Sequence, residues 1–217
     1  MKLYYTKSGA GDPIVLVHGN GEDHHIFRET VEMLEKQFTC YAVDSRGHGK
    51  SPKVKDFHYE DMAGDMVEFL DDHNLENVTF FGFSDGAIIG ILTALKTDRI
   101  SRLVLCGANL SPDGIKPSVH RLLKAAYFFT RDKKIKLMLE EPHITDEQLM
   151  SIKAKTLVLA GENDLIRREE TEHIADLIPN ADLQIVPEHT HISYVVHEPR
   201  AAIEFLAWTN QEGGSHG

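Results

Sequence analysis

The chain has 217 residues, of which 41% are hydrophobic and 26% are charged, a balance typical of one globular domain with a real core. Acidic residues outnumber basic ones by 34 to 23, and the net charge of −11 argues against nucleic acid or an anionic membrane as a partner. No apolar stretch approaches the ~20 residues that cross a bilayer, and residues 1–5 contain no signal-peptide core, so we expect a soluble, cytoplasmic protein.

Six short apolar runs favour β-strands. In chain order they are residues 14–17, 38–43, 78–83, 103–106, 156–160 and 183–186. Near-continuous apolar runs of this length suit strands that are buried on both faces of a parallel sheet. The two cysteines, Cys40 and Cys106, fall inside these runs, so we expect buried thiols of a reducing compartment and no disulfide scaffold.

Helical periodicity falls between these runs. Met62, Met66 and Phe69 share one face of a predicted helix, and residues 174–178 repeat the pattern. Pro199 is expected to open a last helix, because proline suits the first helical turn. Strands that alternate with helices predict an α/β fold with a mostly parallel sheet flanked by helices, in which ligands bind beyond the carboxyl ends of the strands.

Residues 110–150 interrupt this alternation, because they contain no convincing strand. Helical spacing predicts one helix around residues 119–126 and a shorter one around 135–139. We expect a short helical cap over the site, inserted between two strands of a core formed by residues 1–109 and 151–210. Residues 211–217 are expected to form a flexible tail.

The predicted cap is rich in basic and aromatic residues. Only Asp132 opposes seven basic residues, which are Lys116, Arg121, Lys124, Arg131, Lys133, Lys134 and Lys136. This excess could attract an anionic substrate, but we favour a solvated helix face. Tyr127, Phe128 and Phe129 are expected either to line an acyl pocket or to pack the cap on the core.

The most informative motif is Gly82-Phe83-Ser84-Asp85-Gly86. It lies between a predicted strand and the helix-compatible residues 87–96, which is the context of a nucleophile elbow. Such a strained turn lifts a serine hydroxyl clear of the sheet, and the helix N-terminus favours developing negative charge. We therefore predict that Ser84 is a nucleophile; the alternative is a glycine-bracketed turn whose serine has no catalytic role.

With this motif, the chain resembles the α/β-hydrolase superfamily over nearly its whole length. The resemblance also rests on Val17-His18-Gly19-Asn20-Gly21 after one predicted strand and on Asp44-Ser45-Arg46-Gly47-His48-Gly49-Lys50-Ser51 after the next. It implies a small serine esterase-like member with a short cap. It also implies that His18 and His48 brace loops and transfer no protons.

The family order of serine, acid and histidine implies the other two members of a catalytic triad. The segment Gly161-Glu162-Asn163-Asp164 resembles the family's acid loop, which makes Asp164 the carboxylate that orients the base. A plain surface turn is the alternative, since these residue types favour turns. Glu162 and Asp113 are weaker candidates for the acid.

Two histidines compete for the role of the base. The resemblance places the base several residues before the proline of the last helix, and His191 fits that spacing to Pro199 better than His189 does. This His-x-His pair lacks the further ligands of a metal site, so we expect neither a metal nor another cofactor.

The oxyanion hole needs two preorganised N–H donors. The resemblance assigns them to the backbone of Asp85, which follows the nucleophile, and to that of Asn20. Gly21 leaves room for the acyl group. We interpret the side chain of Asp85 as a favourable charge in the first turn of a helix.

These residues predict a serine hydrolase that cleaves carboxylic esters of small acyl groups through an acyl-enzyme intermediate. A C–C bond hydrolase or lyase, a thioesterase and a non-catalytic ligand receptor or signalling partner remain open on the same scaffold. Ser84 argues against relatives that use an aspartate nucleophile. The expected partner is a small-molecule ester, and the sequence leaves the oligomeric state open.

Overall fold

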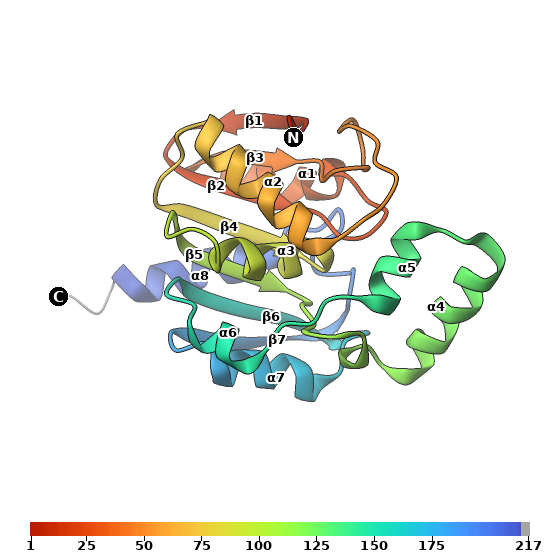
Figure 1. The fold of residues 1–217 in the computed structure, drawn as a ribbon. Helices are drawn as coiled ribbons and strands as arrows, with labels where there is room; N and C mark the ends of the chain where they lie inside the picture. Colours follow the sequence, from red (N-terminus) through yellow and green to blue (C-terminus); the bar gives the residue numbers. More distant parts are fainter. Residues whose placement is uncertain (214–217) are drawn as a thin grey trace.

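A seven-stranded sheet with the strand order β1-β3-β2-β4-β5-β6-β7 forms the centre of the computed structural model, which describes residues 1–213 (Figure 1). The strands are β1 (Tyr5–Gly9), β2 (Asp12–Val17), β3 (Phe38–Val43), β4 (Val78–Phe83), β5 (Ile100–Cys106), β6 (Lys155–Asn163) and β7 (Ala181–Thr190). Only β1 pairs antiparallel with its neighbour; every other pairing is parallel. The predicted α/β fold with a mostly parallel sheet is confirmed.

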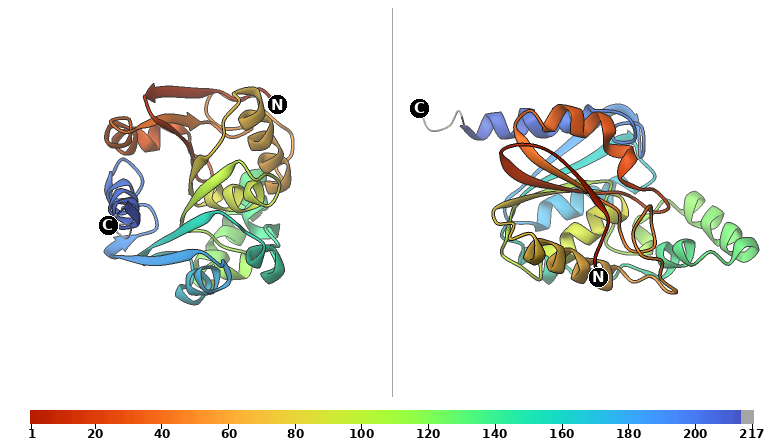
Figure 2. Two further views of the ribbon diagram at one scale, coloured as in Figure 1. Left: turned by 90° about the vertical axis from the view of Figure 1, so that its left-hand side faces the viewer. Right: turned by 90° about the horizontal axis from the view of Figure 1, so that it is seen from above.

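Helices cover both faces of this sheet. They are α1 (Arg28–Leu34), α2 (Tyr59–Asp72), α3 (Asp85–Ala94), α4 (Pro117–Thr130), α5 (Lys133–Glu140), α6 (Asp146–Met150), α7 (Arg168–Leu177) and α8 (Arg200–Gly213), with short 3-10 turns η1 (His24–Phe27) and η2 (Pro112–Gly114). Helices α1 and α8 pack on one face, and α2, α3 and α7 pack on the other (Figures 1 and 2). The sequence predicted all of these helices except α1, α6 and the two 3-10 turns.

Burial on both sides explains why the strands could be recognised. All six residues of β4 are buried, and its adjacent side chains Phe80 and Phe81 belong to two different core clusters, one on each face of the sheet. Burying each such ring stabilises the fold by roughly 1.5–3 kcal/mol relative to exposure. Cys40 and Cys106 are buried free thiols, as predicted.

Helices α4 and α5 project beyond the carboxyl ends of the parallel strands (Figure 1). No residue of α4 is fully buried. Phe128 and Phe129 are 64% and 81% exposed, so the expectation that they line an acyl pocket or pack on the core is wrong for these two rings. Val119 and Leu123 lie on the face of α4 that borders Ser84, whereas Phe128 and Phe129 face solvent.

The C-terminal segment continues as helix farther than we expected. Residues 211–213 of the predicted tail belong to α8, and residues 214–217 lie outside the described part of the chain. Within residues 1–213, the helices lack the combination of length and apolar composition that a membrane-spanning helix requires.

Candidate active site

Ser84 occupies the turn between β4 and α3 with a φ of 52° and a ψ of −116°, a backbone conformation that is rare outside glycine. Its backbone N–H donates to the carbonyl oxygen of Cys106 at 2.8 Å. A Cβ at Gly82 would lie 2.3 Å from the carbonyl oxygen of Gly86, and a Cβ at Gly86 would lie 1.9 Å from that of Val17. The elbow therefore needs glycine on both sides of the serine.

Asp164 and His191 form a buried pair. The Nδ1 atom of His191 lies 2.6 Å from Oδ1 of Asp164, and the carboxylate also accepts the backbone N–H groups of Gly161 and Ile166. Burial by itself would raise the pKa of Asp164, but these hydrogen bonds outweigh burial and hold the pKa below its ordinary value. An ionised Asp164 holds a proton on Nδ1 and leaves Nε2 of His191 free to accept one.

Gly107 lies beside this pair and directly follows a residue that contacts Ser84. That residue is Cys106, whose carbonyl oxygen accepts the N–H of Ser84. A Cβ at Gly107 would lie 2.6 Å from Cε1 of His191, and the ring of Phe83 lies 5.0 Å from the imidazole, centroid to centroid. Ser84 and the pair of Asp164 and His191 therefore lie in the same region, around residues 106 and 107 at the carboxyl end of β5.

The weaker candidates lie elsewhere. His189 is half-buried, and its Nδ1 lies 2.9 Å from the carbonyl oxygen of Ser193. Glu162 is exposed and accepts the backbone N–H of Glu188 at 2.8 Å. Asp113 is exposed on η2. The buried acid–imidazole pair thus contains Asp164 and His191, and not these residues.

Asn20 and Asp85 are linked through their side chains. Nδ2 of Asn20 donates to Oδ2 of Asp85 at 2.8 Å and to the carbonyl oxygen of Lys134 at 3.2 Å. The hydroxyl of Tyr59 donates to the other Asp85 oxygen at 2.8 Å. Burial raises the pKa of Asp85 to about 6, although these hydrogen bonds oppose the shift. The Asp85 side chain therefore ties the loop after β2 to α2, a role that its helical position did not suggest, and the Asn20 side chain ties the same loop to α5.

His18 and His48 hold two loops together. The backbone N–H of Ser45 donates to Nε2 of His18, and Nδ1 of His18 lies 2.8 Å from the carbonyl oxygen of Gly19. The N–H of Gly21 donates to Nε2 of His48. Burial lowers the pKa of both imidazoles, that of His48 to about 4, so both are neutral near pH 7. These contacts agree with the bracing role that the family resemblance implies.

Glu22 is an acid near Ser84 that the sequence analysis did not single out. Its half-buried carboxyl accepts the backbone N–H of Gly19 at 3.1 Å. Burial raises its pKa to about 7, while the Gly19 N–H and the charge of His191 lower it and the charge of Asp85 raises it. The signal available in the sequence was its position, directly after the glycine loop that carries Asn20.

A small cavity opens beside Ser84 under α4 and α5. Its volume is about 90 Å³, and its apolar lining includes Val119, Leu123, Met138 and Ile166. This space admits a short acyl chain. Larger hollows of about 550 Å³ beside Trp208 and about 430 Å³ beside His58 do not contain Ser84, so volume alone does not locate the site.

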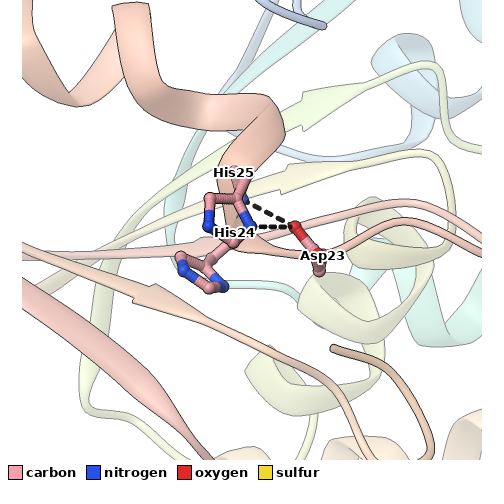
Figure 3. A group of neighbouring side chains, drawn as sticks. All are labelled: Asp23, His24 and His25. Atoms are coloured by element: carbon pink, nitrogen blue, oxygen red, sulfur yellow. Dashed lines mark hydrogen bonds and ion pairs between the residues drawn. The ribbon is translucent and has the colours of Figure 1, made fainter. Parts of the chain in front are cut away.

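The potential metal-ligand atoms of Asp23, His24 and His25 lie within 4.8 Å of one another, an arrangement that could bind a divalent cation (Figure 3). Hydrogen bonds account for their positions without an ion. Asp23 caps η1 by accepting the N–H of His25 and pairs with its ring, and His24 lies 2.7 Å from the buried Asp44. The cluster therefore serves the structure of η1.

Sequence comparison finds relatives with hydrolase names. Serine hydrolase BPHL of Homo sapiens is 28% identical over 226 residues, covering 88% of this chain and 77% of that protein. Esterase YbfF of Escherichia coli is 39% identical over 93 residues, covering 42% of this chain and 37% of that protein. Alignments to six further curated relatives each cover between 24% and 42% of the relative's own length, so the chain spans less than half the length of each of these six.

The fold comparison agrees. A thermophilic esterase from Thermogutta terrifontis superposes with a TM-score of 0.79 at 22% identity, covering 96% of this chain and 93% of the esterase. At this identity the likeness shows the fold alone. The sequence profile of the family described as alpha/beta hydrolase fold matches residues 12–134, more than half of the chain. The chain therefore belongs to the α/β-hydrolase family.

Proposed function

We propose that the protein is a serine esterase in which Ser84 is the nucleophile, His191 the base and Asp164 the residue that orients the base. The observation that carries this proposal is the buried 2.6 Å pair of Asp164 and His191 beside a serine held at positive φ. Esterase and serine hydrolase relatives support the reaction class.

The reaction proceeds in two half-reactions. Nε2 of His191 removes the proton of the Ser84 hydroxyl as Oγ attacks the ester carbonyl. The tetrahedral intermediate then expels the alcohol, which receives that proton, and leaves Ser84 acylated. Water loses a proton to His191 as it attacks the acyl group, and Ser84 regains the proton as the carboxylic acid departs. Asp164 stabilises the imidazolium in both halves.

The backbone N–H groups of Asn20 and Asp85 are the proposed donors to the oxyanion. One comes from the loop after β2 and the other from the first turn of α3, so they approach from two sides of Ser84. The hydrogen bond between the two side chains fixes the loop against the helix. Removing one such donor typically costs about 3 kcal/mol of transition-state stabilisation.

We further propose that residues 110–150 act as a short cap whose inner face selects small acyl groups, on a core of residues 1–109 and 151–210. The cavity of about 90 Å³ supports that selection. The buried free thiols support a reducing, cytoplasmic location. The net charge of −11 supports a small-molecule partner over nucleic acid or an anionic membrane.

A screen of p-nitrophenyl esters of increasing acyl length tests this function. We expect steady turnover that is fastest for the short acyl chains, and a fluorophosphonate probe that labels Ser84. Ser84→Ala should lower kcat/KM by at least about 1,000-fold, whereas Ser118→Ala on the exposed side of α4 should leave it unchanged. A single burst without turnover, or labelling at another serine, would contradict the proposal.

A further inference from the structure

The carboxyl group of Glu22 approaches the nucleophile from the loop after β2. Its Oε2 accepts the backbone N–H of Gly19 at 3.1 Å. A Cβ placed on Gly19 would lie 2.7 Å from this Oε2, 3.1 Å from Cβ of Ser84 and 3.3 Å from Cδ1 of Phe83. The carboxyl of Glu22 and the side chain of Ser84 therefore both border the bare face of Gly19.

This carboxyl retains unused hydrogen-bonding capacity. A carboxylate has about four acceptor sites, and within residues 1–213 Glu22 accepts a single hydrogen bond and pairs with no lysine, arginine or histidine. Burial raises the pKa of this carboxyl to about 7, and the hydrogen bond from Gly19 and the charge of His191 offset only part of that rise. A half-buried acid in this state is suited to receive a donor from a bound molecule.

Asp85 differs in this respect. It also lies next to Ser84, but each of its two oxygens already accepts a hydrogen bond, one from Tyr59 and one from Asn20. Its carboxyl therefore has a structural task within the protein. Of these two acids beside the nucleophile, Glu22 is the one with a free oxygen.

Glu22 lies close enough to His191 for the charge of the imidazole to lower the pKa of its carboxyl, and in the proposed mechanism the alcohol leaves beside His191. Glu22 does not line the cavity under the cap that we assign to the acyl group. The ring of Phe83 borders the same face of Gly19 and packs 5.0 Å from the imidazole of His191, centroid to centroid. In the proposed mechanism His191 returns its proton to the alcohol, so the alcohol half of the ester occupies this side.

We propose that Glu22 is a specificity-determining residue that accepts a hydrogen bond from a donor group, a hydroxyl or a protonated amine, on the alcohol half of the ester. The proposal rests on the esterase function proposed above. A substrate without such a donor leaves the acceptor oxygen of Glu22 unpaired in the complex and is disfavoured.

Three acetate esters test the proposal. n-Propyl acetate carries no donor, 2-hydroxyethyl acetate carries a hydroxyl, and 2-(dimethylamino)ethyl acetate carries an ammonium group at pH 7.5. We would measure kcat/KM for each ester with the wild type, with Glu22→Met, which removes the acceptor oxygens because a glutamine would still accept from a hydroxyl, and with Asp23→Asn. The last variant removes the same charge one residue away, from a carboxyl that caps η1 and pairs with His25.

We expect the wild type and Asp23→Asn to favour at least one donor ester over n-propyl acetate by roughly 10- to 100-fold, the effect of one hydrogen bond to a charged group. Glu22→Met should lose most of that ratio, and the ester whose preference falls identifies the donor as a hydroxyl or an amine. Equal kcat/KM for all three esters, or a ratio that survives in Glu22→Met, overturns the proposal. The absence of all turnover and of Ser84 labelling would instead overturn the esterase function itself.

Discussion

Gly107 provides the space that the imidazole of His191 occupies. The glycine has a φ of +67°, and a Cβ at this position would lie 2.6 Å from Cε1 and 2.8 Å from Nδ1 of the ring. Asp164 contacts the same ring at Nδ1, at 2.6 Å, and its other carboxyl oxygen lies 3.6 Å from the Cβ position of Gly107. The carboxylate and the glycine therefore both border the imidazole near Nδ1 and limit its freedom to move.

Gly107→Ala should therefore damage catalysis more than stability. The added methyl group must displace the imidazole, and positive φ costs a further 1–2 kcal/mol, roughly, in an L-residue. We expect kcat/KM to fall by about 100-fold or more, since small misplacements of a base have effects of that size. Kinetics with a short p-nitrophenyl ester and a thermal melt measure the two effects.

Gly64→Ala is the matched control. Gly64 lies inside α2, and a Cβ there would meet nothing within 4 Å. The substitution should raise the free energy of unfolding by about 0.5–1 kcal/mol, because alanine has the higher helix propensity. Its kcat/KM should match the wild type. Equal activity of the two glycine variants would argue against the proposed position of the base.

Asp164→Asn should lower kcat on the order of 1,000- to 10,000-fold, because an amide no longer fixes the proton on Nδ1 of His191. Glu162→Gln changes the neighbouring acid, which is exposed and accepts the backbone N–H of Glu188. It should leave kcat within about twofold. Steady-state kinetics of both variants decide between the two acids, and a larger loss in Glu162→Gln would reverse the assignment.

The two histidines of residues 189–191 allow the same comparison. His191→Ala should abolish measurable turnover, while His189→Ala removes a half-buried ring that contacts Ser193 and should leave kcat/KM nearly unchanged. Fluorophosphonate labelling of Ser84 should slow in the first variant only. If His189→Ala instead lost most of the activity, the proposed base would be wrong.

The sequence could predict the parts of this fold that have strong local signals. Strands β2 to β6 contain apolar runs because most of their residues are buried, whereas the edge strand β7 has one buried residue, Val186, and a shorter apolar run. β1 escaped notice because it is an edge strand with largely exposed polar residues, and its position depends on antiparallel pairing with β3. Ser84 was recognisable because the elbow requires glycines at fixed positions.

Tertiary contacts explain what the sequence could not show. Asp85 looks like an ordinary first-turn acid, and only folding brings Tyr59 and Asn20 to its two oxygens. Glu22 has no motif of its own, and its proximity to the nucleophile depends on how the loop after β2 folds over Gly19. The orientation of Phe128 depends on how far α4 rotates relative to the sheet, which apolar spacing does not fix.

The buried Asp85 should make stability depend on pH. Burial raises the pKa of this carboxyl from an ordinary 3.8 to about 6, so between these pH values the folded protein keeps a proton that the unfolded chain has released. Its contribution to stability is therefore fully present below about pH 4 and is lost as the pH rises through about 6. A shift of about two pKa units corresponds to about 3 kcal/mol.

Asp85→Asn should remove this dependence, because an amide does not ionise and its oxygen can still accept the hydroxyl of Tyr59. Urea unfolding at pH 4.5, 6 and 8 measures the free energy of unfolding for both proteins. We expect the fall in stability between pH 4.5 and 8 to be smaller in the variant by up to about 3 kcal/mol. Glu22 is the second acid with a raised pKa, at about 7. The same measurement on Glu22→Gln separates its contribution to the pH dependence of stability from that of Asp85. Parallel pH profiles for the wild type and Asp85→Asn would show that the carboxyl is solvated in the folded protein, and would argue against the buried Tyr59–Asp85–Asn20 arrangement.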